Sequence, residues 1–207
     1  MNQLQGKWAL VTGSSRGIGR QIAIGLASHG CNVIVHGREL SNTQQTLQLV
    51  RDRGVEAHSV AGELSSDAGI ESIIRAVREH PGRVDVLYNN AAIMNKYKEI
   101  WEIALDEWRA VFQVNVLAPI ALCTAFAPEM RTRGFGRIVN LTSGIKDQPQ
   151  LAPYSVSKAA IDKYSRDLSA ELGPLNRHID LLVETYPDPN SMQGSYMFFN
   201  NIRSRSS

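Results

Sequence analysis

The feature that most constrains the fold lies near the start of the chain, where an apolar run leads through a glycine-rich turn into a helical pattern. The run covers residues 8–11, and Gly13, Gly17 and Gly19 follow it. At such glycines the backbone can approach a phosphate group that side chains would hold away. A helix that begins there offers free N–H groups and the positive end of its dipole to the same phosphate. The stretch predicts a buried strand, a phosphate-binding turn and a helix; the plainer alternative is a tight turn of an α/β protein that binds no ligand.

The composition favours one domain and excludes several kinds of partner. With 207 residues, 43% of them hydrophobic, the chain can bury one core and is short for two, so we expect a single domain over residues 1–207. Lys/Arg and Asp/Glu are mixed along the chain and leave a net charge of +2, so neither nucleic acid nor a membrane surface is expected to bind.

Cysteine and histidine usage gives no sign of a disulfide framework or a metal site. Cys31 and Cys123 lack C-x-x-C spacing, and the five histidines are scattered. Met1 leads into polar residues, and no uninterrupted apolar stretch approaches membrane-spanning length. We therefore expect a cytoplasmic protein.

Strand-like and helix-like segments alternate from one end of the chain to the other. The predicted strands are residues 8–11, 32–35, 55–60, 84–88, 136–141 and 179–183. The predicted helices are residues 18–29, 41–53, 67–80, 106–133 and 154–172, with an inner face of Ile18, Ile22 and Leu26 in the first and a capping box of Ser41 and Gln44 in the second. This alternation predicts an α/β fold: a single Rossmann-type, doubly wound parallel sheet of six or seven strands with helices on both faces.

A phenol and an ammonium group share one face of a predicted helix. Tyr154 and Lys158 stand four residues apart. A phenol ordinarily ionises at about pH 10, and a nearby positive charge favours the phenolate, so the pair is a candidate acid for proton transfer near neutral pH. The same spacing also occurs by chance on solvated helices.

Two further polar residues occupy informative places. Ser143 follows the strand at 136–141, at the edge where open α/β sheets bind ligands, although serine also simply begins loops. Pro119 follows Asn115 by four residues and has no N–H, so the Asn115 carbonyl loses its helical partner and the helix should kink there. A free carbonyl needs a donor, and water is the expected one; the alternative is a proline that ends one helix before the next.

From residue 6 to residue 183 these motifs follow the order of the short-chain dehydrogenase/reductase family, which the chain resembles. The resemblance rests on T-G-x-x-x-G-x-G at residues 12–19, Asn89-Asn90-Ala91, Asn115, Ser143, and the Tyr154/Lys158 pair. It implies that Tyr154 is the acid/base and that Lys158 tunes it and contacts the ribose. It also implies that Asn115 holds a water and that Ser143, with Thr142 as the adjacent alternative, donates to the substrate carbonyl.

The resemblance further implies a nicotinamide dinucleotide as cofactor. Its binding residues would be Thr12, Gly13, Ser15, Arg16, Gly17, Ile18, Gly19, Arg38, Glu63, Leu64, Asn90, Ala91, Tyr154 and Lys158. Two positions depart from the family pattern. Ala92 replaces a glycine and adds a methyl group where the backbone can require unusual dihedral angles, and Glu63 replaces the usual aspartate beside the adenine.

The residues after the second predicted strand favour NADP(H) over NAD(H). An acidic residue there would bind the ribose hydroxyls of NAD and repel a 2′-phosphate. The chain instead continues with His36-Gly37-Arg38, and Arg16 lies in the glycine turn, so two guanidinium groups can converge on the phosphate. Both arginines could equally be solvated, and Glu39 beside Arg38 keeps that alternative open.

The sequence thus predicts an NADP(H)-dependent oxidoreductase that interconverts a carbonyl and a secondary alcohol on a small molecule. The alternative is a non-catalytic nucleotide-binding or scaffold protein of the same fold with an incomplete substrate site. Small residues along the predicted helix 154–172 permit close packing, and members of the family commonly associate through this helix and the predicted helix 106–133, so we expect a homodimer or homotetramer.

The chain departs from the family pattern after about residue 184. Two prolines follow, and residues 196–199 then have the pattern of a short seventh strand. Too few residues would separate the last two strands to build a substrate lid, which predicts an open, weakly selective or inactive site. The competing interpretation is a truncated chain whose last residues stay disordered.

Overall fold

The computed structural model describes residues 3–143, 148–172 and 179–184 of the chain. The strands are β1 (Trp8–Val11), β2 (Asn32–Gly37), β3 (Ala57–Ala61), β4 (Val86–Asn89), β5 (Gly136–Leu141) and β6 (Ile179–Glu184). The helices are α1 (Gly17–Ser28), α2 (Gln44–Arg51), α3 (Asp67–Glu79), α4 (Leu105–Phe112), α5 (Ala118–Arg133) and α6 (Ala152–Leu172). Short 3₁₀ turns cover Leu40–Thr43, Ile100–Glu102 and Pro149–Leu151, and a π turn covers Gln113–Leu117.

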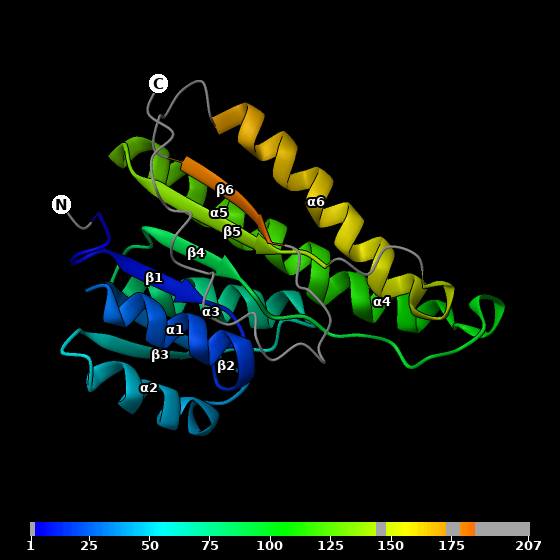
Figure 1. Ribbon diagram of the computed structural model, residues 1–207, viewed down its shortest axis with the longest axis horizontal. Helices are drawn as coiled ribbons and strands as arrows, with labels where there is room; N and C mark the ends of the chain where they lie inside the picture. Colours follow the sequence, from blue (N-terminus) through cyan, green and yellow to red (C-terminus); the bar gives the residue numbers. More distant parts are fainter. Residues whose placement is uncertain (1–2, 144–147, 173–178, 185–207) are drawn as a thin grey trace.

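The described strands form one parallel sheet in the order β3-β2-β1-β4-β5-β6 (Figure 1). The first strand lies in the middle, where Leu10 pairs with Ile34 of β2 on one side and with Leu87 of β4 on the other. The chain therefore winds outward in both directions from β1, and the loops after β1 and β4 meet at the point where the winding reverses. In open α/β sheets that point, at the carboxyl ends of the strands, is where ligands bind.

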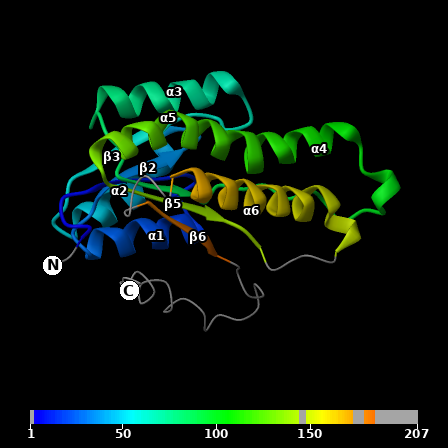
Figure 2. The same ribbon diagram turned by 90° about the horizontal axis from the view of Figure 1, so that it is seen from above.

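Helices cover both faces of the sheet, which confirms the predicted doubly wound fold (Figure 2). Alternate strand residues point to opposite faces. On one face Leu10 packs in a core with residues of α3 and α5, such as Ile73 and Phe126. On the other, Val11 packs with residues of α1 and α2, such as Leu26. The central strand β1 is thus buried on both sides, as expected in a parallel sheet.

Two details of the helices differ from the prediction. Ile18 is 40% exposed and does not join the inner face of α1. The capping box is absent, because Ser41 lies in a 3₁₀ turn and its hydroxyl donates to the Glu39 carboxylate at 3.3 Å instead of accepting from the backbone of α2. A true cap occurs one helix later, where the Ser66 hydroxyl accepts from the Gly69 N–H at 3.2 Å.

The chain stays helical from Leu105 to Arg133, through α4, the π turn and α5. By length and composition alone this segment could cross a membrane, although polar residues such as Gln113, Asn115 and Thr124 interrupt its apolar run. Of its most apolar window, 56% is buried inside the fold. Figure 2 shows α4 and α5 lying along the sheet between α3 and α6, which is the place of a core helix.

The predicted seventh strand at residues 196–199 lies outside the described residues. The same holds for residues 144–147, which belong to the loop between Ser143 and Tyr154.

Candidate cofactor and active site

The glycine turn, residues 12–19, joins β1 to α1 in the conformation that its glycines require. Gly13 has φ +64° and Gly17 has φ +57°, both in the left-handed region. A Cβ on Gly19 would lie 2.5 Å from the carbonyl oxygen of Gly13, so a larger residue would push the turn apart. At Gly17 a Cβ would meet no described atom within 4 Å, so this side of the turn is open.

The loop after β4 is hydrogen-bonded to the glycine turn. The Thr12 hydroxyl accepts from the backbone N–H groups of Asn90 at 3.0 Å and Ala91 at 3.1 Å. The Asn90 side chain donates from Nδ2 to the Thr12 carbonyl at 2.8 Å. Asn90 and Ala91, predicted as cofactor residues, therefore also position the glycine turn.

The start of α1 fits a dinucleotide pyrophosphate. The helix is 12 residues long and has no acidic residue in its first turn, and in the described structure no side chain caps its N-terminus. The free N–H groups and the dipole of α1 are thus available to an anion beside the open face of Gly17. Ser15 is only half-buried, and its carbonyl is occupied by Arg20 Nη2 at 2.6 Å.

The residues on which the NADP(H) prediction rests lie after β2 and in the glycine turn. Arg16 and Arg38 are both exposed, as is Glu39, which accepts from Ser41. His36, between the strand and Arg38, is by contrast only 3% exposed. No aspartate or glutamate occupies β2 itself.

The loops after β3 and β4 hold further predicted cofactor residues and the two departures from the family pattern. Glu63 is exposed, whereas the neighbouring Leu64 is 5% exposed and its side chain belongs to the hydrophobic core, which leaves only its backbone for a ligand. The concern about Ala92 is not borne out, because no non-glycine residue among those described has a positive φ. The methyl group of Ala92 is therefore tolerated without backbone strain.

Asn115 is buried in the π turn, where its side chain joins three elements. Its Oδ1 accepts from the Ile93 N–H at 2.8 Å, and its Nδ2 donates to the Ile93 carbonyl at 2.9 Å and to Ser157 Oγ at 3.0 Å. Ile93 follows β4, and Ser157 lies in α6. The prediction concerned the Asn115 backbone alone and missed this amide bridge.

The helix is interrupted near Pro119, as predicted, and the interruption is a π turn. The Ala118 N–H donates to the carbonyl of Gln113, five residues earlier, where an α-helix would span four. Pro119 then stands at the second position of α5, where its missing N–H costs least. The helix widens by one residue and continues.

Lys158 belongs to α6, lies beside the carboxyl end of β5 and is 5% exposed. Its Nζ donates to the Leu141 carbonyl at 2.6 Å and lies 5.7 Å from the centroid of the Tyr154 ring. The predicted pair thus shares one face of α6. Burial lowers the pKa of Lys158 to about 8, because the low-dielectric interior disfavours its charged form.

Thr142 and Ser143 follow β5 directly, with exposures of 7% and 8%. Both lie next to the Leu141 carbonyl that holds Lys158, so they stand at the same sheet edge as the lysine. Both residues therefore remain candidate donors to a substrate oxygen.

Two positioning residues escaped the sequence analysis. Ser157 accepts the Asn115 amide and donates to the Tyr154 carbonyl at 2.7 Å. Arg20 donates to Thr46 Oγ1 at 3.0 Å as well as to Ser15, so it ties the glycine turn to α2. Adjacency to predicted residues was the only signal for either, because the partners that tie them to other elements, Asn115 and Thr46, are distant in the sequence.

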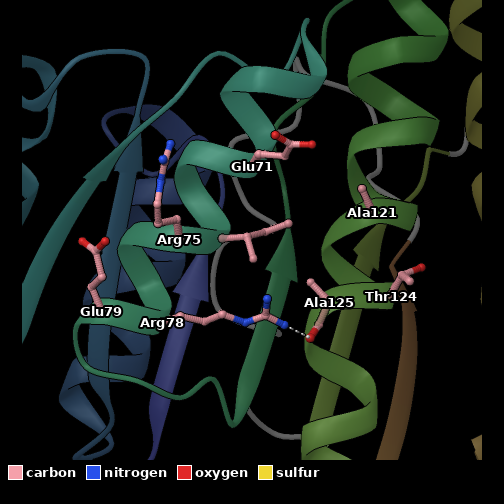
Figure 3. A pocket seen from close by; sticks show the side chains of 8 residues that line it. Glu71, Arg75, Arg78, Glu79, Ala121, Thr124 and Ala125 are labelled. Atoms are coloured by element: carbon pink, nitrogen blue, oxygen red, sulfur yellow. Dashed lines mark hydrogen bonds between the residues drawn. The ribbon is translucent and has the colours of Figure 1, made fainter.

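Two grooves of the described structure lie away from this edge, along the helices. One, of about 740 Å³, runs between α3 and α5 and is lined by Arg75, Arg78 and Thr124 among others (Figure 3). Arg78 spans it and donates to the Ala125 carbonyl at 3.3 Å. The second, of about 620 Å³, lies between α5 and α6. Among the described residues, no group of three or more His, Cys, Asp or Glu side chains could hold a metal ion.

Comparison with known proteins agrees with this arrangement. The short chain dehydrogenase family model matches residues 7–183, and the chain belongs to that family. It is similar to mouse dehydrogenase/reductase SDR family member 4, with 33% identity over 185 residues that cover 88% of this chain. It spans 66% of that relative, slightly under two thirds of its length.

Solved structures give the same result. A metagenomic short-chain oxidoreductase in complex with NADP has 32% identity and a TM-score of 0.82, over 89% of this chain and 84% of that one. An NAD⁺-bound xylitol dehydrogenase has 29% identity and a TM-score of 0.81, over 90% of this chain and 72% of that one. These two similar structures therefore hold different nicotinamide dinucleotides.

Proposed function

We propose that the chain is an NADP(H)-dependent oxidoreductase that interconverts a carbonyl and a secondary alcohol on a small molecule. The observation that carries the proposal is Lys158, a buried lysine held at the carboxyl end of β5 one helical turn from Tyr154. A buried ammonium group is costly for a fold, so its place beside a phenol at the ligand edge favours a catalytic use.

The glycine turn and the start of α1 would hold the dinucleotide. Gly17 and the free N–H groups of α1 would meet the pyrophosphate, and Arg16 and Arg38 would meet a 2′-phosphate. Glu63, the backbone of Leu64, and Asn90 with Ala91 would lie along the adenosine half. When bound, the nicotinamide supplies or accepts the hydride.

The side chains at the end of β5 would handle the proton. Tyr154 would give its phenolic proton to the substrate oxygen as negative charge develops there, and the cation of Lys158 would stabilise the resulting phenolate. Ser143, or Thr142 beside it, would donate a hydrogen bond to the same oxygen. Asn115 fixes the relative positions of the π turn, the loop after β4 and α6, which keeps these groups aligned.

A cofactor-consumption screen against ketones, aldehydes and alcohols tests this function. Oxidation of NADPH or reduction of NADP⁺ with any of them supports it. Dinucleotide binding without turnover on any substrate of the panel favours the alternative, a nucleotide-binding or scaffold protein. Binding of neither NADPH nor NADH would contradict both the oxidoreductase and a nucleotide-binding protein, and would leave the scaffold protein.

We also propose that this single domain works in the cytoplasm as a homodimer or homotetramer formed through α5 and α6. The groove between these helices is lined in part by apolar side chains such as Tyr164 and Leu168. Two large apolar residues nearby, Leu117 in the π turn just before α5 and Val156 in α6, are 50% and 44% exposed. A second copy that covered them would remove apolar surface from water.

A further inference from the structure

His36, in β2, uses both nitrogens of its ring. Its Nδ1 lies 2.9 Å from the backbone nitrogen of Gly13, and its Nε2 lies 3.0 Å from the carbonyl oxygen of Gly62. A backbone N–H can only donate and a carbonyl can only accept. The two partners therefore require a neutral ring with its hydrogen on Nε2, the one form that satisfies both.

The backbone of His36 holds the next residue of the glycine turn. The Ser14 N–H donates to the His36 carbonyl at 3.0 Å, and the His36 N–H donates to the Ser14 hydroxyl at 2.9 Å. That hydroxyl donates in turn to the Val11 carbonyl at 2.7 Å. The backbone and the ring of His36 together hydrogen-bond two consecutive turn residues, Gly13 and Ser14, to the end of β2.

On its other side Gly13 faces the loop after β4. A Cβ on Gly13 would lie 3.1 Å from the Cβ of Ala91, and the Asn90 amide nitrogen lies 3.4 Å from the Gly13 carbonyl. Gly13 is thus held between His36 and this loop. Because Gly13 begins the turn that leads to Gly17 and α1, its position decides where the open face of that turn lies.

We propose that His36 is a positioning residue of the dinucleotide site: its neutral ring sets the glycine turn for the pyrophosphate and ties it to Gly62, beside the adenine contact Glu63. The inference rests on the proposed cofactor binding. Protonation of the ring would place a hydrogen on Nδ1, which could then no longer accept the hydrogen bond from the Gly13 N–H. Burial lowers the pKa of His36, and this outweighs the opposing effects of the Gly62 carbonyl and the Glu63 carboxylate, the charged group that acts on the ring.

Two substitutions of His36 distinguish the hydrogen bond from Gly13 from the hydrogen bond to Gly62. His36→Asn places an acceptor oxygen where Nδ1 lies and can keep the bond from Gly13, but it is too short to reach Gly62. His36→Gln can reach Gly62 but offers no acceptor at the Nδ1 position. The exposed imidazole of His80, outside the turn, gives the control His80→Gln.

The measurements are equilibrium binding of NADPH, followed by its fluorescence, and thermal unfolding of each variant. They need no substrate. We expect His36→Gln to bind NADPH about tenfold more weakly than the native chain, as the loss of one buried hydrogen bond implies, whereas His36→Asn and His80→Gln stay within about threefold. If both His36 variants bind NADPH like the native chain, with or without a lower Tm, the inference is overturned. If the native chain binds neither NADPH nor NADH, the proposed oxidoreductase function itself is contradicted.

Nitrogen NMR of the native chain gives a second test that does not depend on how the variants fold. We expect the His36 ring to carry its hydrogen on Nε2 at neutral pH, and its signals and the Gly13 amide to shift when NADPH is added. A ring protonated on Nδ1, or signals of both groups that NADPH leaves unchanged while it binds, would refute the positioning role.

Discussion

Lys158 donates a hydrogen bond of 2.6 Å to the carbonyl of Leu141, a residue 17 positions earlier in the chain. The bond joins α6 to the carboxyl end of β5. It therefore places the Tyr154/Lys158 pair, which is local to one helix, beside Thr142 and Ser143, which belong to a strand end.

Removing the phenolic hydroxyl should abolish most of the turnover and leave cofactor binding intact. Tyr154→Phe keeps the ring but loses the proton donor, and general acid catalysis contributes about 10²- to 10⁴-fold in rate. Steady-state rates and NADPH affinity measure the two effects separately. Tyr164→Phe, on the same helix but in the groove beside α5, is the control and should retain its rate. Near-native turnover in Tyr154→Phe would remove Tyr154 from the mechanism.

Stability should depend on the charge of Lys158. Its pKa is lowered to about 8 in the folded chain from an ordinary value of 10.5, so between these values the unfolded chain binds the extra proton. Stability from this group therefore rises with pH across that window: the full cost of burying the charge applies below about pH 8 and vanishes above about 10.5.

Lys158→Met removes this dependence. Denaturant unfolding at a series of pH values should show the native chain gaining ~3 kcal/mol relative to the variant between pH 8 and 10.5. Since other titrating groups are common to both proteins, they cancel in the difference. A difference that does not change with pH would mean that Lys158 is charged equally easily in both states.

Arg38→Ala should weaken NADPH binding about tenfold and leave NADH binding unchanged, because a guanidinium on the 2′-phosphate acts on NADPH alone. Parallel titrations with the two dinucleotides measure the ratio. Arg53→Ala, an exposed arginine just beyond α2, serves as the control. Equal losses for both cofactors would show that Arg38 does not set the preference.

Asn115→Asp tests the amide bridge. The carboxylate can still accept from the Ile93 N–H, but it faces the Ile93 carbonyl and the Ser157 hydroxyl without hydrogens to donate. We expect a loss of about 2 kcal/mol or more at neutral pH. The loss should shrink as the pH falls and the carboxyl regains a hydrogen, since burial raises the pKa of such a group in the folded state.

Urea unfolding at pH 7 and pH 5 measures this effect. Ser157→Ala, which removes only one partner of Asn115, should be milder and should show no such recovery in acid. A stability of Asn115→Asp equal to that of the native chain at neutral pH would mean that the bridge contributes little.

Val156→Glu should disrupt self-association by placing a charge on the exposed face of α6. Sedimentation velocity at micromolar concentration should show an oligomer for the native chain and a smaller species for the variant. Ile100→Glu, on an apolar residue that is 46% exposed in the loop before α4, is the matched control. A native monomer, or a variant oligomer of unchanged size, would contradict association through α5 and α6.

Much of the fold follows from local patterns in the sequence. Apolar runs of strand length, helical periodicity and glycine or proline at the ends predicted all six described strands and their alternation with helices. They did so because a parallel sheet covered on both faces leaves a strong apolar signal in each strand. Details that depend on competition between neighbours were missed: Ser41 bonds Glu39 instead of capping α2, and Ile18 faces solvent.

For the candidate site, the sequence by itself determined which residue types are present and which lie one helical turn apart, such as Tyr154 and Lys158. Only the tertiary structure decided what these residues contact. The buried environment that lowers the pKa of Lys158, the bridge from Asn115 to Ile93 and Ser157, and the His36 ring between Gly13 and Gly62 all join segments more than ten positions apart. Periodicity reports only neighbours on one element, whereas desolvation and hydrogen bonding depend on which elements the sheet order brings together.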